Sequence, residues 1–309
     1  MKLKAFKLVK PLALTLLLAL AGPSVQAKDL KFGFAVMDLA NPYFVAVADG
    51  FKSGAKAKNI EAIVTDSKMD ASTQVNAVEN YIALGVDVII VSPVDPKAME
   101  PLVKKAHDKN IKFISQAQMV PGSDGFITLD EYNYGLAGGM MAGEWLKKNA
   151  KGPVDVAVLD LPELEPIIAR ANGLADGVKK VYPEAKVVAR QPASTPETGM
   201  RATETILQAN PKVKVVIAIN DAGALGAYET FKATGRNTKD HYVGGLDATA
   251  EAIAKMKEKG AYRGTVDIDP FGTGKLVIDT AIQIAKSGAI KDKVMIKMIP
   301  VTQEDALKR

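Results

Sequence analysis

The sequence contains no cysteine and only two histidines among its 309 residues. The lack of cysteine excludes thiolate zinc sites, iron–sulfur clusters, cysteine nucleophiles and disulfide bonds. Neither His107 nor His241 stands near a serine or carboxylate in the order of a catalytic triad. We therefore expect a protein that is not an enzyme and that holds neither a metal nor a cofactor.

Low-complexity segments and a Gly/Ser-rich linker are also missing, and a composition of 48% hydrophobic and 24% charged residues is typical of a globular protein. Two short motifs are weak matches to known sites. Gly272–Lys275 lacks the glycine spacing of a phosphate-binding loop, so we interpret it as a helix start. Asp267–Gly272 contains a proline and lacks the terminal glutamate of a calcium loop.

The N-terminus combines a basic start with a short apolar run. Its basic residues are Lys2, Lys4, Lys7 and Lys10. The uncharged run that follows, at 11–21, is too short to span a bilayer, which needs about 20 residues. This order predicts a secretory signal peptide at residues 1–27, cleaved after Ala27, although a buried helix is the alternative. Because no cysteine follows the run, we expect an unlipidated protein in the periplasm.

The formal net charge of +5 and a pI near 9 suggest an acidic partner. However, four lysines are the only charged residues in 1–27, so their removal takes the basic residues from 40 to 36, against 35 acidic ones. The remaining chain carries a net charge of only +1, and we expect neither a nucleic-acid partner nor a membrane-surface partner. A transcription regulator would need a DNA-binding helix pair ahead of Leu30, where the predicted signal peptide stands.

Short apolar runs alternate with longer segments of helical period after residue 27, which is the pattern of βαβ units around a parallel sheet. The predicted strands are Leu30–Val36, Glu61–Thr65, Val86–Val91, Lys112–Ser115, Val154–Leu159, Lys186–Ala189, Val213–Ile219, Tyr242–Leu246 and Tyr262–Asp267. The predicted helices include Tyr43–Lys58, Ser72–Leu84, Pro96–Asn110, Tyr132–Asn149, Glu163–Val181, Thr198–Asn210, Ala222–Thr234 and Ala248–Lys259. Gly85 and Gly235 stand where two of these helices end. So many strands predict an α/β fold with two doubly wound parallel sheets in two lobes.

Amides, carboxylates and two aromatic residues follow the predicted strands, at the edge where ligands bind to open parallel sheets. The candidates are Asn41, Tyr43, Phe44, Gln116, Gln118, Asn220, Asp247 and Asp267. Amide and carboxylate groups match vicinal hydroxyls, and aromatic rings match the C–H face of a sugar, so we expect a polyhydroxylated small molecule. Each residue has an alternative role: Asp and Asn cap helices, and Tyr43 and Phe44 can pack beneath the first helix.

Several motifs occur in an order that resembles one family. They are Asn41-Pro42-Tyr43-Phe44, Gly85-Val86-Asp87, Ser92-Pro93, Asp130-Glu131-Tyr132, Arg170-Ala171-Asn172-Gly173, Asn220-Asp221, Gly244-Gly245-Leu246-Asp247 and Asp269-Pro270. In this order and spacing, the chain after residue 27 resembles the ribose-type periplasmic sugar-binding proteins of ABC importers.

The resemblance implies two similar lobes joined by a hinge of three crossovers, with the ligand in the cleft between them. The N-terminal lobe is expected to comprise 28–131 plus 269–296, and the C-terminal lobe 132–268 plus 297–309. The residues matching the family's cleft are Asn41, Tyr43 and Phe44 on the first lobe and Arg170, Asn220 and Asp247 on the second.

The resemblance also implies a function: capture of a sugar, polyol or cyclitol by lobe closure and delivery to a membrane ABC permease. The alternative is a periplasmic ligand receptor for a sensor kinase or chemoreceptor. A monomer is expected. Three positions depart from the family: Ala117-Gln118 replaces an Asp-Arg pair, Ile268 replaces a glutamine, and Leu246 replaces an aromatic residue. These changes favour a ligand with fewer hydroxyls than ribose or galactose.

Overall fold

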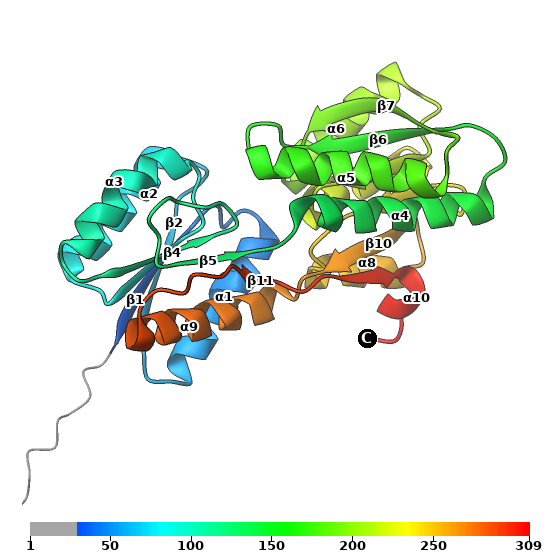
Figure 1. Ribbon diagram of the computed structural model, residues 1–309. Helices are drawn as coiled ribbons and strands as arrows, with labels where there is room; N and C mark the ends of the chain where they lie inside the picture. The colour runs from blue at the N-terminus through cyan, green and yellow to red at the C-terminus, as the bar shows by residue number, and fades with distance from the viewer. Residues whose placement is uncertain (1–29) are drawn as a thin grey trace, which may run out of the picture.

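A computed structural model describes residues 30–309, so the predicted signal peptide lies outside the described residues. Two six-stranded sheets, each flanked by helices, form two lobes side by side (Figure 1). The prediction of an α/β fold with two parallel-sheet lobes is confirmed.

The first sheet belongs to the N-terminal lobe. Its strands are β1 (Lys31–Val36), β2 (Glu61–Asp66), β3 (Val88–Val91), β4 (Lys112–Gln116), β5 (Gly125–Thr128) and β11 (Val294–Met295). They lie in the order β11-β5-β4-β3-β1-β2, and all neighbours are parallel. All four residues of β3 are buried, as in a central strand that helices cover on both faces.

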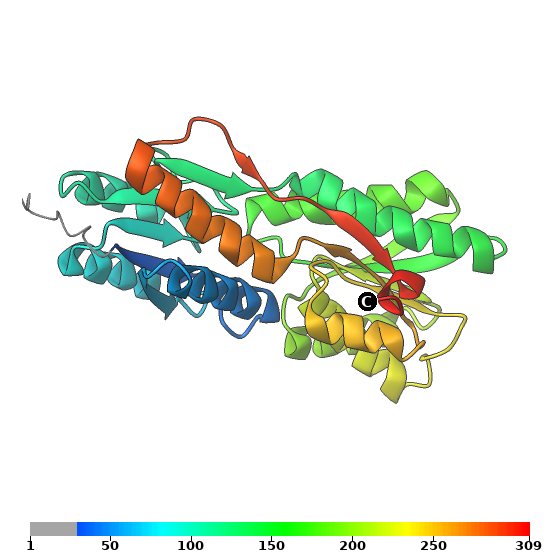
Figure 2. The same ribbon diagram turned by 90° about the horizontal axis from the view of Figure 1, so that it is seen from below.

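The second sheet has the same order of strands with one change of direction. Its strands are β6 (Val154–Asp160), β7 (Ala185–Pro192), β8 (Val215–Ala218), β9 (Tyr242–Gly244), β10 (Tyr262–Asp267) and β12 (Ile299–Thr302), in the order β12-β10-β9-β8-β6-β7. The edge strand β12 is antiparallel to β10, unlike the all-parallel expectation. The reason lies in the chain path: β11 runs toward the second lobe, and the chain continues straight into β12, away from the first lobe (Figure 2).

Ten helices occur within residues 30–309. They are α1 (Pro42–Lys56), α2 (Ala71–Leu84), α3 (Pro96–His107), α4 (Glu131–Asn149), α5 (Glu165–Val181), α6 (Pro196–Ala209), α7 (Asp221–Ala233), α8 (Ala250–Lys257), α9 (Pro270–Ser287) and α10 (Gln303–Ala306). Side-chain caps begin several of them; Asp70, for example, accepts the backbone N–H of Thr73 at 2.6 Å. Gly85 ends α2 in the left-handed conformation, as predicted from its position.

Three passages connect the lobes. The chain crosses between β5 and α4, between β10 and α9, and between β11 and β12. Helix α9 lies beside α1 in the first lobe although more than 200 residues separate their starts, because it enters that lobe at the second passage (Figure 2). The carboxyl ends of the strands in one sheet therefore face those of the other sheet across the passages.

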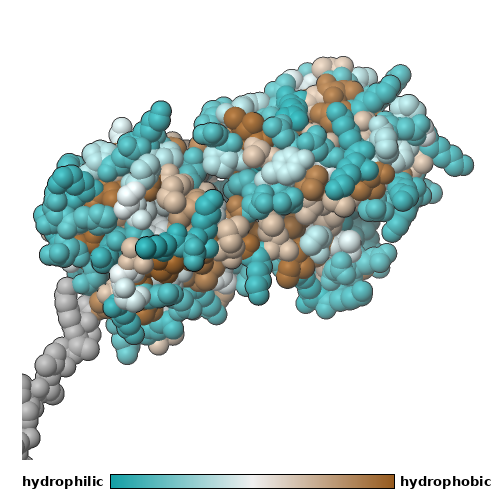
Figure 3. Space-filling view, in the orientation of Figure 1, coloured by the Kyte–Doolittle hydropathy of each residue, from teal (hydrophilic) through white to brown (hydrophobic). Residues whose placement is uncertain are grey.

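The surface of the described residues carries hydrophobic side chains as small separate patches among hydrophilic ones on the face shown in Figure 3. None of the helices within residues 30–309 is both long enough and apolar enough to cross a membrane. In the same part of the chain, no group of three or more His, Asp or Glu side chains is placed to hold a metal ion.

Candidate functional site

A cavity of about 100 Å³ lies between the lobes, a size that suits one small molecule. Eight of the nine predicted site residues line it: Asn41, Tyr43, Phe44, Gln116, Gln118, Arg170, Asn220 and Asp247. They come from the two sides of the interlobe passages, so the cavity has polar groups from both lobes.

On the first lobe, Tyr43 and Gln116 form a hydrogen-bonded pair. The Gln116 amide donates to the Tyr43 hydroxyl at 3.3 Å, and its oxygen accepts from the Ser92 hydroxyl at 2.5 Å. Burial raises the pKa of Tyr43, so its hydroxyl stays protonated and can donate to a ligand. The Phe44 ring meets the Tyr43 ring edge-on, with 5.0 Å between centroids, so the aromatic pair forms one wall.

Asn41 and Gln118 hold the backbone at the rim of this wall. The Asn41 side chain accepts the N–H of Tyr43 at 2.9 Å and so caps α1, which was the alternative role for this residue. The Gln118 amide donates to the carbonyl of Pro93 at 2.7 Å. Ala117, between the two glutamines, has a φ of 66°, a conformation that a non-glycine residue adopts at a cost and that occurs often at functional sites.

On the second lobe, Arg170 contacts three partners. Its Nε donates to the carboxylate of Glu131 at 2.6 Å, its Nη1 donates to the carbonyl of Ile219 at 2.9 Å, and its guanidinium lies 5.0 Å from the centre of the Tyr134 ring. Burial acts to lower the pKa of Arg170, but the Glu131 carboxylate outweighs it, so the pKa stays above its ordinary value. The arginine is charged at any physiological pH.

Asn220 caps α7 as well as lining the cavity. Its side-chain oxygen accepts the N–H of Gly223 at 2.9 Å, and its amide donates to the carbonyl of Ser194 at 2.9 Å. Asn220 can therefore cap the helix and line the cavity at once, because Gly223 uses its side-chain oxygen and Ser194 uses only one of its two N–H groups.

Asp247 is the most unusual group of the cavity. It is 4% exposed, its φ is 113°, and its Oδ1 accepts from the Tyr134 hydroxyl at 2.9 Å. Within residues 30–309 its Oδ2 has no hydrogen-bond donor. Burial raises the pKa of Asp247 well above its ordinary value, and the neighbouring charge of Asp221 raises it further. A ligand donor is the natural partner for this oxygen.

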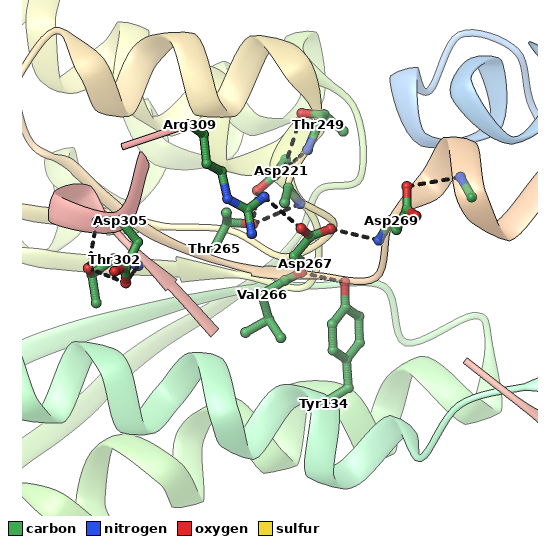
Figure 4. A network of polar contacts seen from close by, with 12 residues as sticks. Tyr134, Asp221, Thr249, Thr265, Val266, Asp267, Asp269, Thr302, Asp305 and Arg309 are labelled. Carbon is green, nitrogen blue, oxygen red and sulfur yellow. Dashed lines mark hydrogen bonds and ion pairs between the residues drawn. The ribbon is translucent and has the colours of Figure 1, made fainter. Parts of the chain in front are cut away.

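Asp221 lies behind Asp247 and is fully buried. Its carboxylate accepts from four donors: the N–H and hydroxyl of Thr249 at 2.8 and 3.2 Å, and the hydroxyls of Tyr262 and Thr265 at 2.8 Å each. The Thr249 and Thr265 contacts are visible in Figure 4. These four donors leave the Asp221 carboxylate little capacity to bind a ligand. Its bonds to Thr249 instead hold the loop that carries Asp247.

Asp267 is the one predicted site residue that does not line this cavity. Its carboxylate pairs with Arg309 at 2.6 Å and accepts the N–H of Asp269 at 2.6 Å (Figure 4). The physical reason is the alternation of side chains along β10: Ile268, the next residue, lines the cavity instead.

Sequence reasoning missed most of the apolar lining. These residues include Met37, Leu129, Leu161, Leu164, Pro166, Ile167, Ile219, Ile268 and Ile296. A signal was available for the group at 161–167, because it directly follows a predicted strand and so stands at the ligand edge. Glu131 was also missed as a lining residue, although it lies in a motif that the sequence analysis singled out.

The positions that depart from the family pattern lie in two different parts of the structure. Ala117, Gln118 and Ile268 line the cavity, so these three changes alter its chemistry. Leu246 is fully buried and packs in the core, where it contacts the helix that carries Gly138.

The family model for a periplasmic binding protein domain matches residues 32–289. The ribose import binding protein of Bacillus subtilis is 28% identical over 283 residues, which cover 91% of this chain and 90% of the relative. Two solved structures of ABC transporter solute binding proteins are similar throughout. One, from Mycobacterium smegmatis with bound glycerol, has a TM-score of 0.82 at 27% identity, covering 91% of this chain and 96% of the other. The second, from Bacillus halodurans with bound myo-inositol, has a TM-score of 0.80 at 28% identity and the same coverage.

Proposed function

The chain belongs to the family of periplasmic binding protein domains, and from that premise we propose that it captures one small sugar, polyol or cyclitol and delivers it to an ABC permease. The observation that carries the proposal is the small cavity that both lobes line with polar side chains. A molecule bound there has contacts with both lobes, and such contacts favour a closed arrangement over an open one.

The proposed mechanism is a shift of population rather than a reaction. The lobes, 28–131 with 269–296 and 132–268 with 297–309, are proposed to turn about the three passages as they close on the ligand. The permease then distinguishes the closed, loaded form from the open form by shape.

The proposed binding residues fall into two groups. Tyr43, Gln116, Arg170 and Asp247 present hydroxyl, amide, guanidinium and carboxylate groups to the ligand, while Phe44 offers an apolar face. Asn41, Gln118 and Asn220 line the cavity as well, and their bonds to backbone groups fix the loops from which the first group projects.

We also propose export to the periplasm through a signal peptide at 1–27, without lipidation, and a monomeric protein. The relatives favour import over a role as receptor for a sensor kinase or chemoreceptor, because one is named as an import protein and the others as ABC transporter components.

The test is isothermal titration of the protein, purified from the periplasm of cells that express the full chain. The panel contains D-ribose, D-allose, myo-inositol, glycerol and other sugars and polyols of this size, and Asp247→Ala is measured beside the unchanged protein. We expect saturable one-to-one binding of at least one compound and a loss of roughly tenfold or more in the variant, since a buried polar contact is removed. Failure of all these compounds, and of their amino derivatives, to bind contradicts the proposed function.

A further inference from the structure

The lining of the cavity has more carboxyl groups than cationic groups. Three carboxylates, those of Asp38, Glu131 and Asp247, line it against a single guanidinium, that of Arg170. The Glu131 and Arg170 side chains are only 10% and 12% exposed, and Asp247 is 4% exposed. Water therefore screens these charges weakly, and their balance affects which ligand is bound.

Arg170 does not neutralise Asp247. Its charge is matched by Glu131 at 2.6 Å, and a further donor is taken by the carbonyl of Ile219. Within residues 30–309 no Lys, Arg or His atom lies within 4.0 Å of the Asp247 carboxylate. The one cation of the cavity is thus already used by a different carboxylate.

The surroundings of Asp247 add negative charge rather than remove it. The ionisable groups that face it are Tyr43 from α1, Glu131 and Tyr134 from α4, Arg170 from α5, Asp221 from α7 and Tyr262 from β10. Only one of these groups is a cation, and the direct neighbour on the interior side is a second buried carboxylate. Burial raises the pKa of Asp247 and that carboxylate raises it further, while the charge of Arg170, which is not in direct contact, opposes them only in part.

The rest of the cavity is unusually apolar for a ligand rich in hydroxyls. Leu161, Leu164, Pro166 and Ile167 form one continuous stretch of the lining, and Ile268 occupies a position at the end of β10. A hydroxyl placed against such side chains loses its hydrogen bonds to water and gains none from the protein.

We propose that the ligand is a cation, an amino sugar or aminocyclitol in which one ammonium group pairs with the free Oδ2 of Asp247 and a face with few hydroxyls packs on the apolar stretch. This inference rests on the proposed function and names the ligand class of the same cavity. A buried carboxylate is stable when it is both paired with a cation and hydrogen-bonded. The ammonium group would supply the direct ion pair that no protein cation makes with Asp247.

The experiment compares matched pairs of compounds that differ only by an amine in place of a hydroxyl. The pairs are D-glucose with D-glucosamine and scyllo-inositol with 1-amino-1-deoxy-scyllo-inositol, titrated at pH 7 against the protein from the periplasm. We expect the amine of at least one pair to bind tenfold or more tighter than its neutral partner. If each neutral compound binds as tightly as its amine or more tightly, the inference fails while the proposed function stands; if nothing in either set binds, both fail.

Two variants assign the preference to one side chain. Asp247→Asn keeps the shape and the Tyr134 contact but removes the charge, and we expect it to bind the two members of a pair within about threefold of each other. Asp279→Asn makes the same change on the exposed surface of α9 and should keep the full preference. An Asp247→Asn protein that still prefers the amine overturns the proposal.

A pH series gives a second readout that a purely structural role would not move. Both carboxylates of the buried pair must lose their protons for Asp247 to attract a cation fully. Affinity for the amine is therefore expected to rise from pH 5 to pH 7, while affinity for the neutral partner changes little. A flat profile for the amine contradicts the ionic pairing.

Discussion

The ion pair of Glu131 with Arg170 shapes the side of the cavity that helices α4 and α5 form. Both are nearly buried, and Arg170 reaches three partners at once. Breaking a buried ion pair on one side leaves the other charge without compensation. This pair therefore stabilises the site, and its loss affects the fold as well as the ligand.

We expect Glu131→Gln to lower the free energy of unfolding by about 3 kcal/mol, since a buried guanidinium then lacks its counterion. Urea denaturation followed by circular dichroism measures the change. The double variant Glu131→Gln with Arg170→Met serves as the control, because no charge is stranded; its loss should be smaller than the sum of the two single losses. Additive losses would show that the pair is not coupled.

The raised pKa of Asp221 predicts that the stability of the protein depends on pH. Burial raises its pKa to about 6, above the ordinary value of 3.8. Between these values the folded protein holds a proton that the unfolded chain has lost, so the contribution of this group to the free energy of unfolding falls as the pH rises from 4 to 6. One pKa unit corresponds to about 1.4 kcal/mol.

The measurement is urea denaturation of the unchanged protein and of Asp221→Asn at pH 4, 5, 6 and 7. Carboxylates other than Asp247 titrate alike in both proteins and cancel in the comparison. The variant also removes the charge that raises the pKa of Asp247, and this acts on the deficit in the same direction. In the variant an NH2 group replaces one carboxylate oxygen and cannot accept the two hydrogen bonds made there, so the variant is less stable throughout, but its deficit should shrink as the pH rises. A deficit that grows with pH would mean that Asp221 is stabilised as an anion in the fold.

At the scale of elements, the helix pair α1 and α9 depends on close backbone approach. A methyl group on Gly50 would overlap the backbone carbonyl of Phe271, whereas a methyl group on Gly54 would meet only the side chain of Ile278. Backbone atoms cannot move aside without separating the helices, but a side chain can change its rotamer.

We therefore expect Gly50→Ala to lower the free energy of unfolding by about 2 kcal/mol or more, the range for overpacked interiors. Gly54→Ala is the comparison on the same helix and should lower it less, because the added methyl group meets a side chain rather than the backbone and the gain in helix propensity of about 1 kcal/mol offsets part of the contact with Ile278. Thermal denaturation distinguishes the two. Equal effects of both substitutions would show that the helices do not pack as closely as described.

The helices and strands with a clear hydrophobic period were predictable from the sequence, and those without one were not. The predicted strand at Tyr262–Asp267 has the bounds of β10, and the predicted helix at 72–84 differs from α2 by one residue. Strands β5, β11 and β12 were missed because they are short and, unlike the equally short β3 and β8, do not lie within a longer apolar run. Their pairing partners, distant in sequence, define them.

The candidate site also has a part that was predictable from the sequence and a part that was not. Polar residues after strands were found because the rule that ligands bind at strand ends applies to each strand separately. Ile268 rather than Asp267 lines the cavity, and a rule about strand ends does not say which of two adjacent residues faces inward. The pairing of Arg170 with Glu131 was not predictable, because it joins residues of two helices whose relative placement only the packing decides.

For the whole molecule, the proposed lobe closure predicts a change of overall shape. Small-angle X-ray scattering should show a smaller radius of gyration when a bound compound from the panel is present, because the lobes turn toward each other. Asp247→Ala at the same ligand concentration serves as the control and should keep the dimensions of the free protein. A radius that is unchanged at ligand saturation would contradict closure.

The central claim is that one small molecule lies between the lobes and touches both. The most direct measurement is a crystal structure of the protein with the tightest compound of the panel. We predict the ligand in the cavity, with a hydrogen bond to Oδ2 of Asp247 on one lobe and contact with the Tyr43 and Phe44 rings on the other. A ligand held by one lobe alone, or bound outside this cavity, would contradict the account.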